Sequence, residues 1–474
     1  MDKVIGRMDE YKKLESCMNK NEAQFIVVYG RRRVGKTFLI NSFFDNNFSY
    51  KLTGIYKHSR SVQLQNFIDE LNRHTGKKMK APSDWVMAFS LLREYLESLP
   101  CDKKHVVFFD EMPWMDTPKS GFLSAFEWFW NSWGSSRNNL VFIACGSASS
   151  WLSENIDKNK GGLYNRFTCR IYLDPFTLKE TEEYLIARGI NWSRYTITEC
   201  YMILGGIPFY LSLLKPEMTY NDNIDNMFFR RHAELWDEFE HLYSTLFIGS
   251  DQYIRIVETL STKKGGMTRN EIIDATKIPS NGNLTKMLSN LEYSGFIRIY
   301  NTFGKNKKEL VYQLSDYYSA FYFRFIKDHK NPDESFWTNS LDNSCRKAWA
   351  GLTFEQVCKD HIRNIKKALG ISGVLTEISS WSAQSTDEYE GAQIDLVIDR
   401  RDHMINLCEI KYSAEEYTID KKYDMVLRNK MGSFRNITKT KKGLAITMIT
   451  TYGIKKNMYS STVANVVTID DLFV

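Results

Sequence analysis

Short runs of consecutive apolar residues alternate with longer segments of helical periodicity over the first part of the chain. The runs are FIVVYG (25–30), FSYKLTG (48–54), HVVFFDE (105–111) and LVFIACGS (140–147). A strand that helices cover on both faces is apolar at nearly every position, as in a buried parallel sheet. The pattern therefore predicts an α/β domain over residues 1–175.

The pattern of apolar positions changes after this domain. KETEEYLIARG and TECYMILGG have helical periodicity and end at glycines, which predicts a helical lid over residues 176–245. Residues 246–325 contain helices followed by the alternating runs FIRIY and LVYQLSD, with polar GKNKKE between them. Helices followed by a hairpin of this kind predict a winged helix-turn-helix.

The last third of the chain predicts a second α/β unit. The polar stretch NPDES indicates a linker over residues 326–345. Residues 346–474 open with the helical segment KAWAGLTFEQVCKDHIRNIKKALG and continue into the strands QIDLVID and INLCEIKYS. Several domains are also what a chain of 474 residues should hold, because a domain usually has roughly 100 to 200 residues.

Composition and charge exclude several classes of protein. Hydrophobic residues make up 43% and aromatic residues 14%, too much for a disordered or fibrous chain. The net charge of +6 is too small to indicate a partner by itself. The eight cysteines form no C-x-x-C pair and the eight histidines are scattered, so neither a zinc site nor a disulfide framework is predicted.

No membrane association is predicted. The first residues, MDKVIGRMDEYKKLE, lack the apolar core of a signal peptide. No apolar run approaches the roughly 18 residues that a membrane-spanning helix needs. We expect a cytoplasmic protein.

One segment matches a phosphate-binding loop in full. GRRRVGKT (30–37) fits G-x-x-x-x-G-K-[ST] and lies between the strand FIVVY and the helical TFLINSFF. In such a loop the backbone N–H groups surround the phosphates, and the following helix directs its positive N-terminus at them. Lys36 would reach the β- and γ-phosphates, and Thr37 would ligate Mg²⁺. The candidate nucleotide-binding residues are Gly30, Arg31, Arg32, Arg33, Val34, Gly35, Lys36, Thr37 and Phe38.

Polar residues at the ends of two other strands complete a candidate hydrolytic site. Asp110 and Glu111 follow the apolar run VVFF. Asp110 would hold the magnesium ion, and Glu111 would polarise the attacking water. Ser147 ends the strand LVFIACG and could contact the γ-phosphate or that water. A polar residue is common at a strand end, so Ser147 is the less specific of the three.

Several motifs together resemble a known family. VIGRMDE (4–10) resembles the hhGRExE element found upstream of the phosphate loop in STAND ATPases, a class related to AAA+ proteins. With GRRRVGKT, FFDEMPWMD, ACGSASSW, GGLYNRFT and LGGIPFYL, residues 1–325 resemble the archaeal-type ATPases. The resemblance implies ATP and Mg²⁺ as cofactors. It also implies that Gly6 and Arg7 border the adenine, that Arg166 is a candidate arginine finger, and that Pro208 joins the lid to the nucleotide. A homo-oligomer is left open.

The predicted winged helix has two readings. Leu284, Met287, Leu288 and Leu291 recur at helical spacing and predict the buried face of its second helix, which leaves Asn283, Lys286 and Asn290 outward. Lys305, Lys307 and Lys308 would lie at the wing tip. These side chains suit contacts to DNA. Winged helices in such ATPases also serve as intramolecular clamps, so the two readings remain equal.

The C-terminal strands carry a second group of candidate catalytic residues. Asp395 lies on one strand, and Glu409 and Lys411 lie on the next; residues two apart share a face of a strand. Two carboxylates can hold Mg²⁺ while a lysine activates water, as a phosphodiesterase requires. Glu355, on the preceding helix, could add a third ligand.

Residues 346–474 resemble the PD-(D/E)xK nuclease superfamily through the spacing D-x13-E-x-K and the helical glutamate. The resemblance implies a restriction-endonuclease-like fold. No second proline-aspartate signature is present. The sequence therefore predicts an ATPase whose nucleotide state controls a winged helix and a nuclease-like domain acting on DNA. The alternative is a nucleotide-switched DNA- or protein-binding regulator with an inactive nuclease-like fold.

Overall fold

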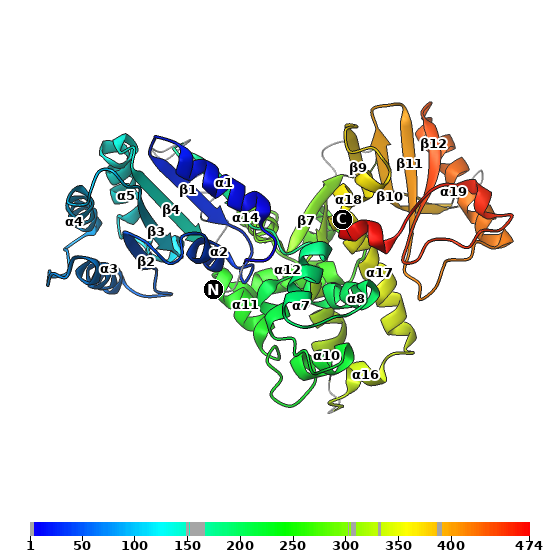
Figure 1. Ribbon diagram of the computed structural model, residues 1–474. Coiled ribbons are helices and arrows are strands. Elements are labelled where there is room, and N and C mark those ends of the chain that lie inside the picture. Colours follow the sequence, from blue (N-terminus) through cyan, green and yellow to red (C-terminus); the bar gives the residue numbers. More distant parts are fainter. Residues whose placement is uncertain are drawn as a thin grey trace. The chain divides into compact units, whose positions relative to one another are not determined.

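The computed structural model describes residues 4–147, 151, 166–301, 303–304, 310–329, 333–385 and 391–474. The chain divides into two compact units. The first comprises Met1–Pro175 and Ser289–Gly295, and the second comprises Phe176–Leu288 and Phe296–Val474. Figure 1 shows their elements coloured along the sequence.

The first unit is built on a five-stranded sheet in the order β2-β3-β4-β1-β5. All four strand pairs are parallel. The strands are β1 (Gln24–Tyr29), β2 (Tyr50–Thr53), β3 (His105–Asp110), β4 (Leu140–Gly146) and β5 (Cys169–Tyr172). The predicted parallel α/β sheet is confirmed. The sequence pattern had indicated the first four strands but not β5.

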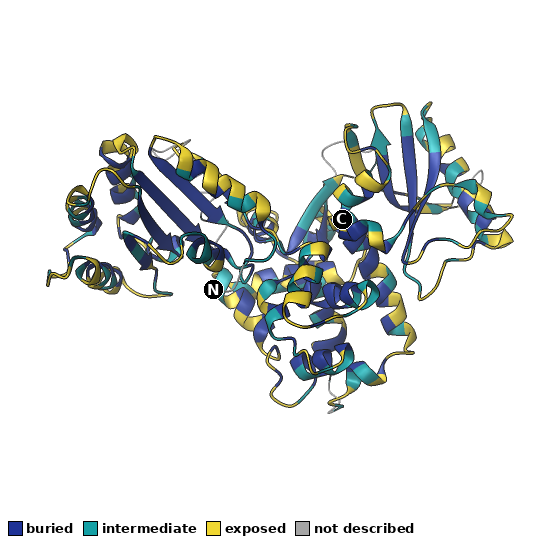
Figure 2. Cartoon of the chain, in the orientation of Figure 1, coloured by how far each residue is buried: buried dark blue, intermediate teal, exposed yellow. Residues whose placement is uncertain are grey.

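Helices join and cover these strands. They are α1 (Met8–Asn19), α2 (Lys36–Phe43), α3 (Arg60–Thr75), α4 (Trp85–Glu97) and α5 (Phe122–Ser132). The three central strands β1, β3 and β4 are buried along almost their whole length, whereas α1 carries many exposed residues (Figure 2). Consecutive apolar residues in the sequence are thus explained by burial on both faces of the sheet.

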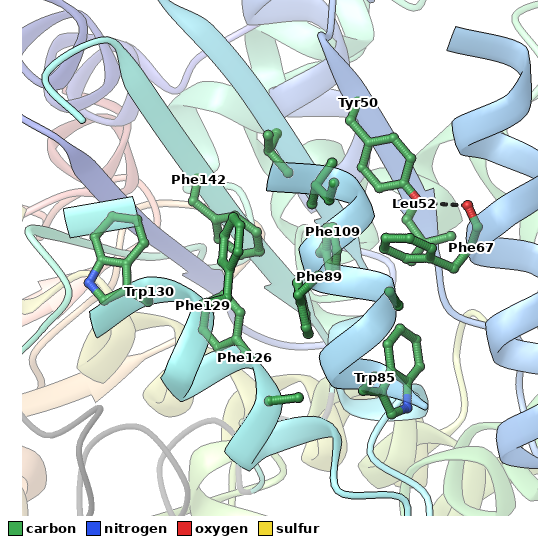
Figure 3. Packing of buried hydrophobic residues seen from close by; sticks show 14 of the residues in the cluster. Tyr50, Leu52, Phe67, Trp85, Phe89, Phe109, Phe126, Phe129, Trp130 and Phe142 are labelled. Atoms are coloured by element: carbon green, nitrogen blue, oxygen red, sulfur yellow. Dashed lines mark hydrogen bonds between the residues drawn. The ribbon is translucent and has the colours of Figure 1, made fainter. Parts of the chain in front are cut away.

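Aromatic side chains fill the core on one face of the sheet (Figure 3). The ring of Phe89, on α4, stacks on Phe109 of β3 with centroids 6.0 Å apart and on Phe129 of α5 at 5.2 Å. The hydroxyl of Tyr50 donates to the carbonyl of Phe67 at 2.9 Å, which satisfies a buried polar group. Close packing of large rings resists deformation. This core therefore supports the ends of β3 and β4, where the candidate acids and Ser147 lie.

The N-terminal part of the second unit is helical. Its helices are α7 (Leu178–Ala187), α8 (Arg194–Leu204), α9 (Pro208–Ser212), α10 (Tyr220–Phe228) and α11 (Glu238–Leu246). A capping box between Thr177 and Glu180 begins α7. The backbone N–H of Leu178 also donates to Nε2 of His361, at 3.0 Å, in the C-terminal part of the same unit. These helices and the C-terminal residues therefore share one packed body.

A small three-stranded sheet follows, in the order β6-β8-β7. The strands are β6 (Met267–Thr268), β7 (Ile297–Asn301) and β8 (Leu310–Leu314). The helices of the same segment are α12 (Ser250–Ser261), α13 (Arg269–Thr276) and α14 (Gly282–Tyr293). The four predicted apolar positions of α14 are buried. The prediction for Asn290 is wrong, because it is only 7% exposed. Asn290 directly precedes Leu291, which belongs to the buried face of the helix.

The segment predicted as a linker is packed. It contains α16 (Phe336–Asn339), after α15 (Tyr317–Phe321) and a π-helical turn (Tyr322–Ile326). The indole of Trp337 is fully buried, and its backbone N–H donates to the carboxylate of Asp225 at 2.7 Å. The described residues 333–345 of the predicted linker therefore pack within the second unit.

The C-terminal sheet is mixed, in the order β13-β12-β11-β10-β9. Its strands are β9 (Thr376–Ala383), β10 (Ala392–Arg400), β11 (Met404–Lys411), β12 (Gly443–Thr450) and β13 (Val463–Val467). β9, β10 and β11 pair antiparallel, and β11, β12 and β13 pair parallel. The helices are α17 (Ser344–Asp360), α18 (Ile362–Ala368) and α19 (Lys421–Thr438). The predicted mixed α/β unit is confirmed as a mixed sheet. None of the helices in the described parts of the chain is long and apolar enough to cross a bilayer.

Candidate nucleotide-binding site and carboxylate cluster

The predicted phosphate loop connects β1 to α2. Gly30 has φ 143° and Gly35 has φ 90°, a conformation that disfavours a side chain. A Cβ added to Gly30 would also collide with the backbone carbonyl of Leu173. Gly35 is the N-cap of α2, so the free N–H groups of that helix begin directly after the loop. The loop geometry fits an anion at the helix N-terminus.

Lys36 lies beneath this loop. It is 6% exposed, and its Nζ donates to the carbonyl of Gly30 at 3.1 Å and to that of Arg31 at 2.8 Å. Burial lowers the pKa of the Lys36 ammonium. Electrostatic interactions with Cys145, Glu111 and Asp110 oppose that shift. A cation held by two carbonyls at this position is placed to meet phosphate oxygens.

Thr37 and Asp110 bring oxygen ligands together. The Thr37 hydroxyl donates to both carboxylate oxygens of Asp110, at 3.1 and 3.0 Å. Asp110 is 5% exposed at the end of β3, and Thr37 lies in the first turn of α2. A hydroxyl and a carboxylate are the hard oxygen donors that Mg²⁺ prefers. These residues therefore fit the magnesium ion that the sequence predicted.

Glu111 and Ser147 meet at the ends of neighbouring strands β3 and β4. Oε2 of Glu111 accepts from the backbone N–H of Ser147 at 3.0 Å and from its hydroxyl at 2.9 Å. The backbone of Glu111 has φ 47°, which is uncommon for a residue with a side chain. Ser147 is 2% exposed. The serine is thus joined to the candidate catalytic acid.

The segment VIGRMDE (4–10), upstream of the phosphate loop, also contacts that loop. Gly6 and Arg7 both have positive φ, and Nη2 of Arg7 donates to the carbonyl of Val34 at 3.3 Å. Phe38 is half exposed on α2. Arg31 is buried, and Arg32 and Arg33 are partly buried.

The family resemblance also implied roles for Arg166 and Pro208. Arg166 is exposed in the first unit, and Pro208 begins α9 in the second unit. Their roles toward a nucleotide stay predictions.

Cys145 was not singled out from the sequence. It is fully buried on β4, and burial together with the nearby Asp110 raises the pKa of its thiol. Lys36 and Cys145 interact electrostatically beneath the loop. The sequence signal that could have indicated Cys145 is its position on a continuous apolar strand, two residues before Ser147.

In the second unit, Asp395 and Glu409 lie on paired strands. Leu396 pairs with Cys408 in the antiparallel β10–β11 register, which brings Asp395 beside Glu409. Oδ2 of Asp395 accepts from the backbone N–H of Ile410 at 3.2 Å. Burial and the charge of Asp395 raise the pKa of the Glu409 carboxyl. Asp395 and Glu409 therefore lie side by side on neighbouring strands, as strand alternation predicted.

Two lysines and one hydroxyl already lie against the Glu409 carboxylate. Nζ of Lys430, on α19, lies 2.6 Å from Oε1, and the hydroxyl of Tyr423 donates to Oε2 at 3.1 Å. Nζ of the predicted Lys411 lies 3.7 Å from Oε2. Lys430 and Tyr423 were not predicted, because nothing local in the sequence ties α19 to β11.

Glu355 is likewise paired, by a lysine from outside the C-terminal sheet. Nζ of Lys264 lies 2.5 Å from its Oε1. Burial and the charge of Asp395 raise the pKa of the Glu355 carboxyl. Among the residues that the structure describes, no three His, Cys, Asp or Glu side chains are grouped to hold a metal ion. Asp395 and Glu409 are thus neighbours, but they do not form the predicted three-carboxylate metal site with Glu355, and lysines pair with Glu355 and Glu409.

Only some of the residues predicted to contact DNA are among the described residues. Asn283 and Lys286 are exposed on α14. Lys305, Lys307 and Lys308 lie outside the described residues.

The parallel sheet, the Gly30–Thr37 loop and the acids after β3 define a P-loop ATPase core. Residues 5–214 match the family described as an ATPase domain predominantly from Archaea. This part of the chain is thus similar to the ATPase domains found mainly in Archaea.

Similar proteins include two from Methanocaldococcus jannaschii. The uncharacterized protein MJECL04 is 25% identical over 413 residues, which cover 86% of this chain and 87% of that protein. The uncharacterized ATP-binding protein MJ0423 is 50% identical over 42 residues, 9% of this chain and 71% of that protein.

Two solved structures are distant matches. The Walker-type ATPase PABY2304 of Pyrococcus abyssi has 18% identity and a TM-score of 0.48, covering 68% of this chain and 96% of its own. The Aeropyrum pernix ORC2 protein has 13% identity and a TM-score of 0.40, covering 72% and 98%.

Proposed function

We propose that ATP hydrolysis at the Gly30–Thr37 loop controls a winged helix and a nuclease-like C-terminal domain, and that the protein acts on DNA. The observation that carries the hydrolytic part is the Glu111 carboxylate, which lies at the end of β3 beside Asp110 and is held by Ser147. A strained, oriented acid next to a phosphate loop is suited to polarise water.

Each residue of the site has its own proposed role. Backbone N–H groups of the loop and Lys36 bind the phosphates. Thr37 and Asp110 would hold Mg²⁺, which supplies charge neutralisation when bound. Glu111 accepts the proton of the attacking water, and Ser147 orients that carboxylate.

Phosphate release tests this assignment. Glu111→Gln keeps the shape of the side chain but not its basicity, so we expect turnover to fall by at least about a hundredfold, within the range of general-base catalysis, while ATP still binds. Glu94→Gln, an exposed residue on α4, is the matched control and should leave turnover unchanged. Equal turnover in both variants would contradict the role of Glu111.

Action on DNA is supported by the arrangement of α12, α13, α14 and the β6-β8-β7 sheet. Helices followed by a small antiparallel sheet are the layout of a winged helix. Asn283 and Lys286 are exposed on the second helix of the pair, where base and phosphate contacts are made in such modules. Duplex binding measured at several salt concentrations tests it, and binding without salt dependence would contradict it.

The second candidate is a nucleotide-switched regulator with an inactive nuclease-like fold. Lys430, Tyr423 and Lys264 favour it, because they satisfy the carboxylates without a metal. Incubation of the full chain with several nucleic acids, Mg²⁺ or Mn²⁺ and ATP separates the two. Cleavage that Glu409→Ala abolishes supports the nuclease, and no cleavage under any condition supports the regulator.

A further inference from the structure

His361 lies between the helical part and the C-terminal part of the second unit, and it is only 3% exposed. The backbone N–H of Leu178, the first residue of α7, donates to its Nε2 at 3.0 Å. Its Nδ1 lies 2.9 Å from the carbonyl of Val357, on α17. One imidazole ring therefore joins α7 to α17.

These two partners fix the protonation state of the ring. A backbone N–H can only donate, so Nε2 must offer a lone pair to Leu178. A carbonyl can only accept, so the proton is on Nδ1, which donates to Val357. The neutral imidazole thus uses both of its nitrogens. A second proton, on Nε2, would face the N–H of Leu178 and break that hydrogen bond.

Burial of the ring favours the same neutral form. It lowers the pKa of the His361 imidazole, because a charged ring would lose its hydration. Leu178 begins α7, so the positive end of that helix also points at Nε2. On α18, which follows His361, the nearest charged residue along the chain is Arg363, and it is exposed. The ring therefore lies where an added positive charge is disfavoured.

Two carboxylates act in the opposite direction. The hydrogen bond to Val357 and the charges of these carboxylates raise the pKa of His361, but by less than burial lowers it. The carboxylates are those of Asp360, at the end of α17, and Glu180, on α7. Asp360 is already engaged, since Nη2 of Arg298 lies 2.8 Å from its Oδ1.

The other elements packed against α7 and α18 are α8 and the last helical turn, Ile469–Phe473. α8 places the ring of Tyr201 against the imidazole, with centroids 5.5 Å apart. The last turn carries two acids. Nη1 of Arg194 lies 3.0 Å from Oδ1 of Asp470, and Asp471 caps the turn. Both acids are thus engaged within the second unit.

The proton balance sets the direction of the effect. A histidine in water has a pKa of about 6.5. Because the pKa of His361 is lower in the packed state, packing is fully favoured above about pH 6.5 and weakens as the pH falls below that value. We propose that His361 is a pH-sensitive joint, which holds α7 against α17 while its imidazole is neutral and releases α7 when the ring is protonated. This inference goes beyond the proposed ATPase and does not depend on it.

Amide hydrogen exchange of the full chain, followed by mass spectrometry, tests the proposal. Protection of α7 is compared at about pH 7.5 and about pH 5.5, after correction for the intrinsic effect of pH on exchange. We expect protection to fall about tenfold at the lower pH, because a released histidine takes up a proton over one pH unit below its ordinary pKa.

Two variants identify the source of the effect. His361→Gln places an amide that does not titrate, so protection of α7 should lose its dependence on pH. His403→Gln changes an exposed histidine of the same unit and should retain the wild-type dependence. Exchange of the imidazole C2 hydrogens in wild type gives a second measurement without any substitution, because it follows the titration of each histidine. His361 should titrate at a lower pH than His403.

The outcomes decide the proposal in either case. Equal protection of α7 at the two pH values in wild type would overturn it, and so would an equal loss in wild type and His361→Gln. If His361→Gln does not fold, the C2 exchange of wild type decides. Titration of His361 at or above the pH of His403 overturns the joint. Titration below it, together with the loss of α7 protection in wild type, supports the joint.

Discussion

Ser147 binds Glu111 through two donors that converge on a single carboxylate oxygen, at 3.0 Å from the backbone N–H and 2.9 Å from the hydroxyl. The two residues follow adjacent parallel strands, β3 and β4. A small shift of one strand end against the other would therefore change the direction of the carboxylate. The serine links the strand beside the phosphate loop to the acid that we assign to water activation.

Ser147→Ala should lower turnover without changing ATP affinity. The alanine removes one of the two donors, and the backbone N–H remains. Partial loss of orientation predicts a fall in phosphate release of roughly tenfold, equal to about 1.4 kcal/mol of activation free energy. Parallel assays of phosphate release and ATP binding check this. A decrease as large as that of Glu111→Gln would contradict a purely orienting role, and so would no decrease at all.

Phe89→Ala should destabilise the first unit strongly. Its ring is fully buried and stacks on Phe109 and Phe129, so alanine leaves a cavity within the aromatic core. Such substitutions cost about 3–5 kcal/mol of unfolding free energy. Val86→Ala, a 49% exposed position on the same helix, is the control and should stay within about 0.5 kcal/mol. Urea unfolding of both variants measures the difference. Similar midpoints would mean that this core does not hold the sheet.

Replacing Lys305, Lys307 and Lys308 together with alanine should weaken duplex binding and reduce its salt dependence. Each lysine–phosphate contact contributes roughly 0.9 to the slope of log affinity against log salt, so the slope should flatten by up to about three units. The slope is measured from binding titrations at several salt concentrations. An unchanged slope would assign the winged helix to internal contacts, such as those of Phe303 and Arg298.

Local sequence signals predicted where the phosphate loop and the acids after β3 lie in the fold, whereas their roles toward a nucleotide stay predictions. A loop of fixed spacing directly after an apolar strand places Lys36 and Thr37 by covalent proximity, and Asp110 ends a strand that must be buried. β5 was missed because it is a short edge strand, Cys169–Tyr172, without a continuous apolar run. Edge strands lack the double burial that makes central strands recognisable.

Contacts between distant segments could not be read from the sequence. Helical periodicity has an angular tolerance, so Asn290 was placed outward although it is only 7% exposed. Lys264 and Glu355 are separated by 91 residues, and Lys430 and Glu409 by 21, with no motif that joins them. Strand alternation predicted the shared face of Asp395 and Glu409 but not the lysines that close it.

ATP binding to wild type and to Lys36→Ala, measured by calorimetry with Mg²⁺, tests the central claim most directly. Lys36 is the buried side-chain cation held by the loop carbonyls, and its removal should abolish detectable binding. Lys12→Ala, an exposed lysine on α1, is the control for a lost positive charge and should bind as wild type does. Loss of binding in Lys36→Ala alone is the predicted result. Equal ATP affinity in all three proteins would contradict the assignment of the Gly30–Thr37 loop as the nucleotide site.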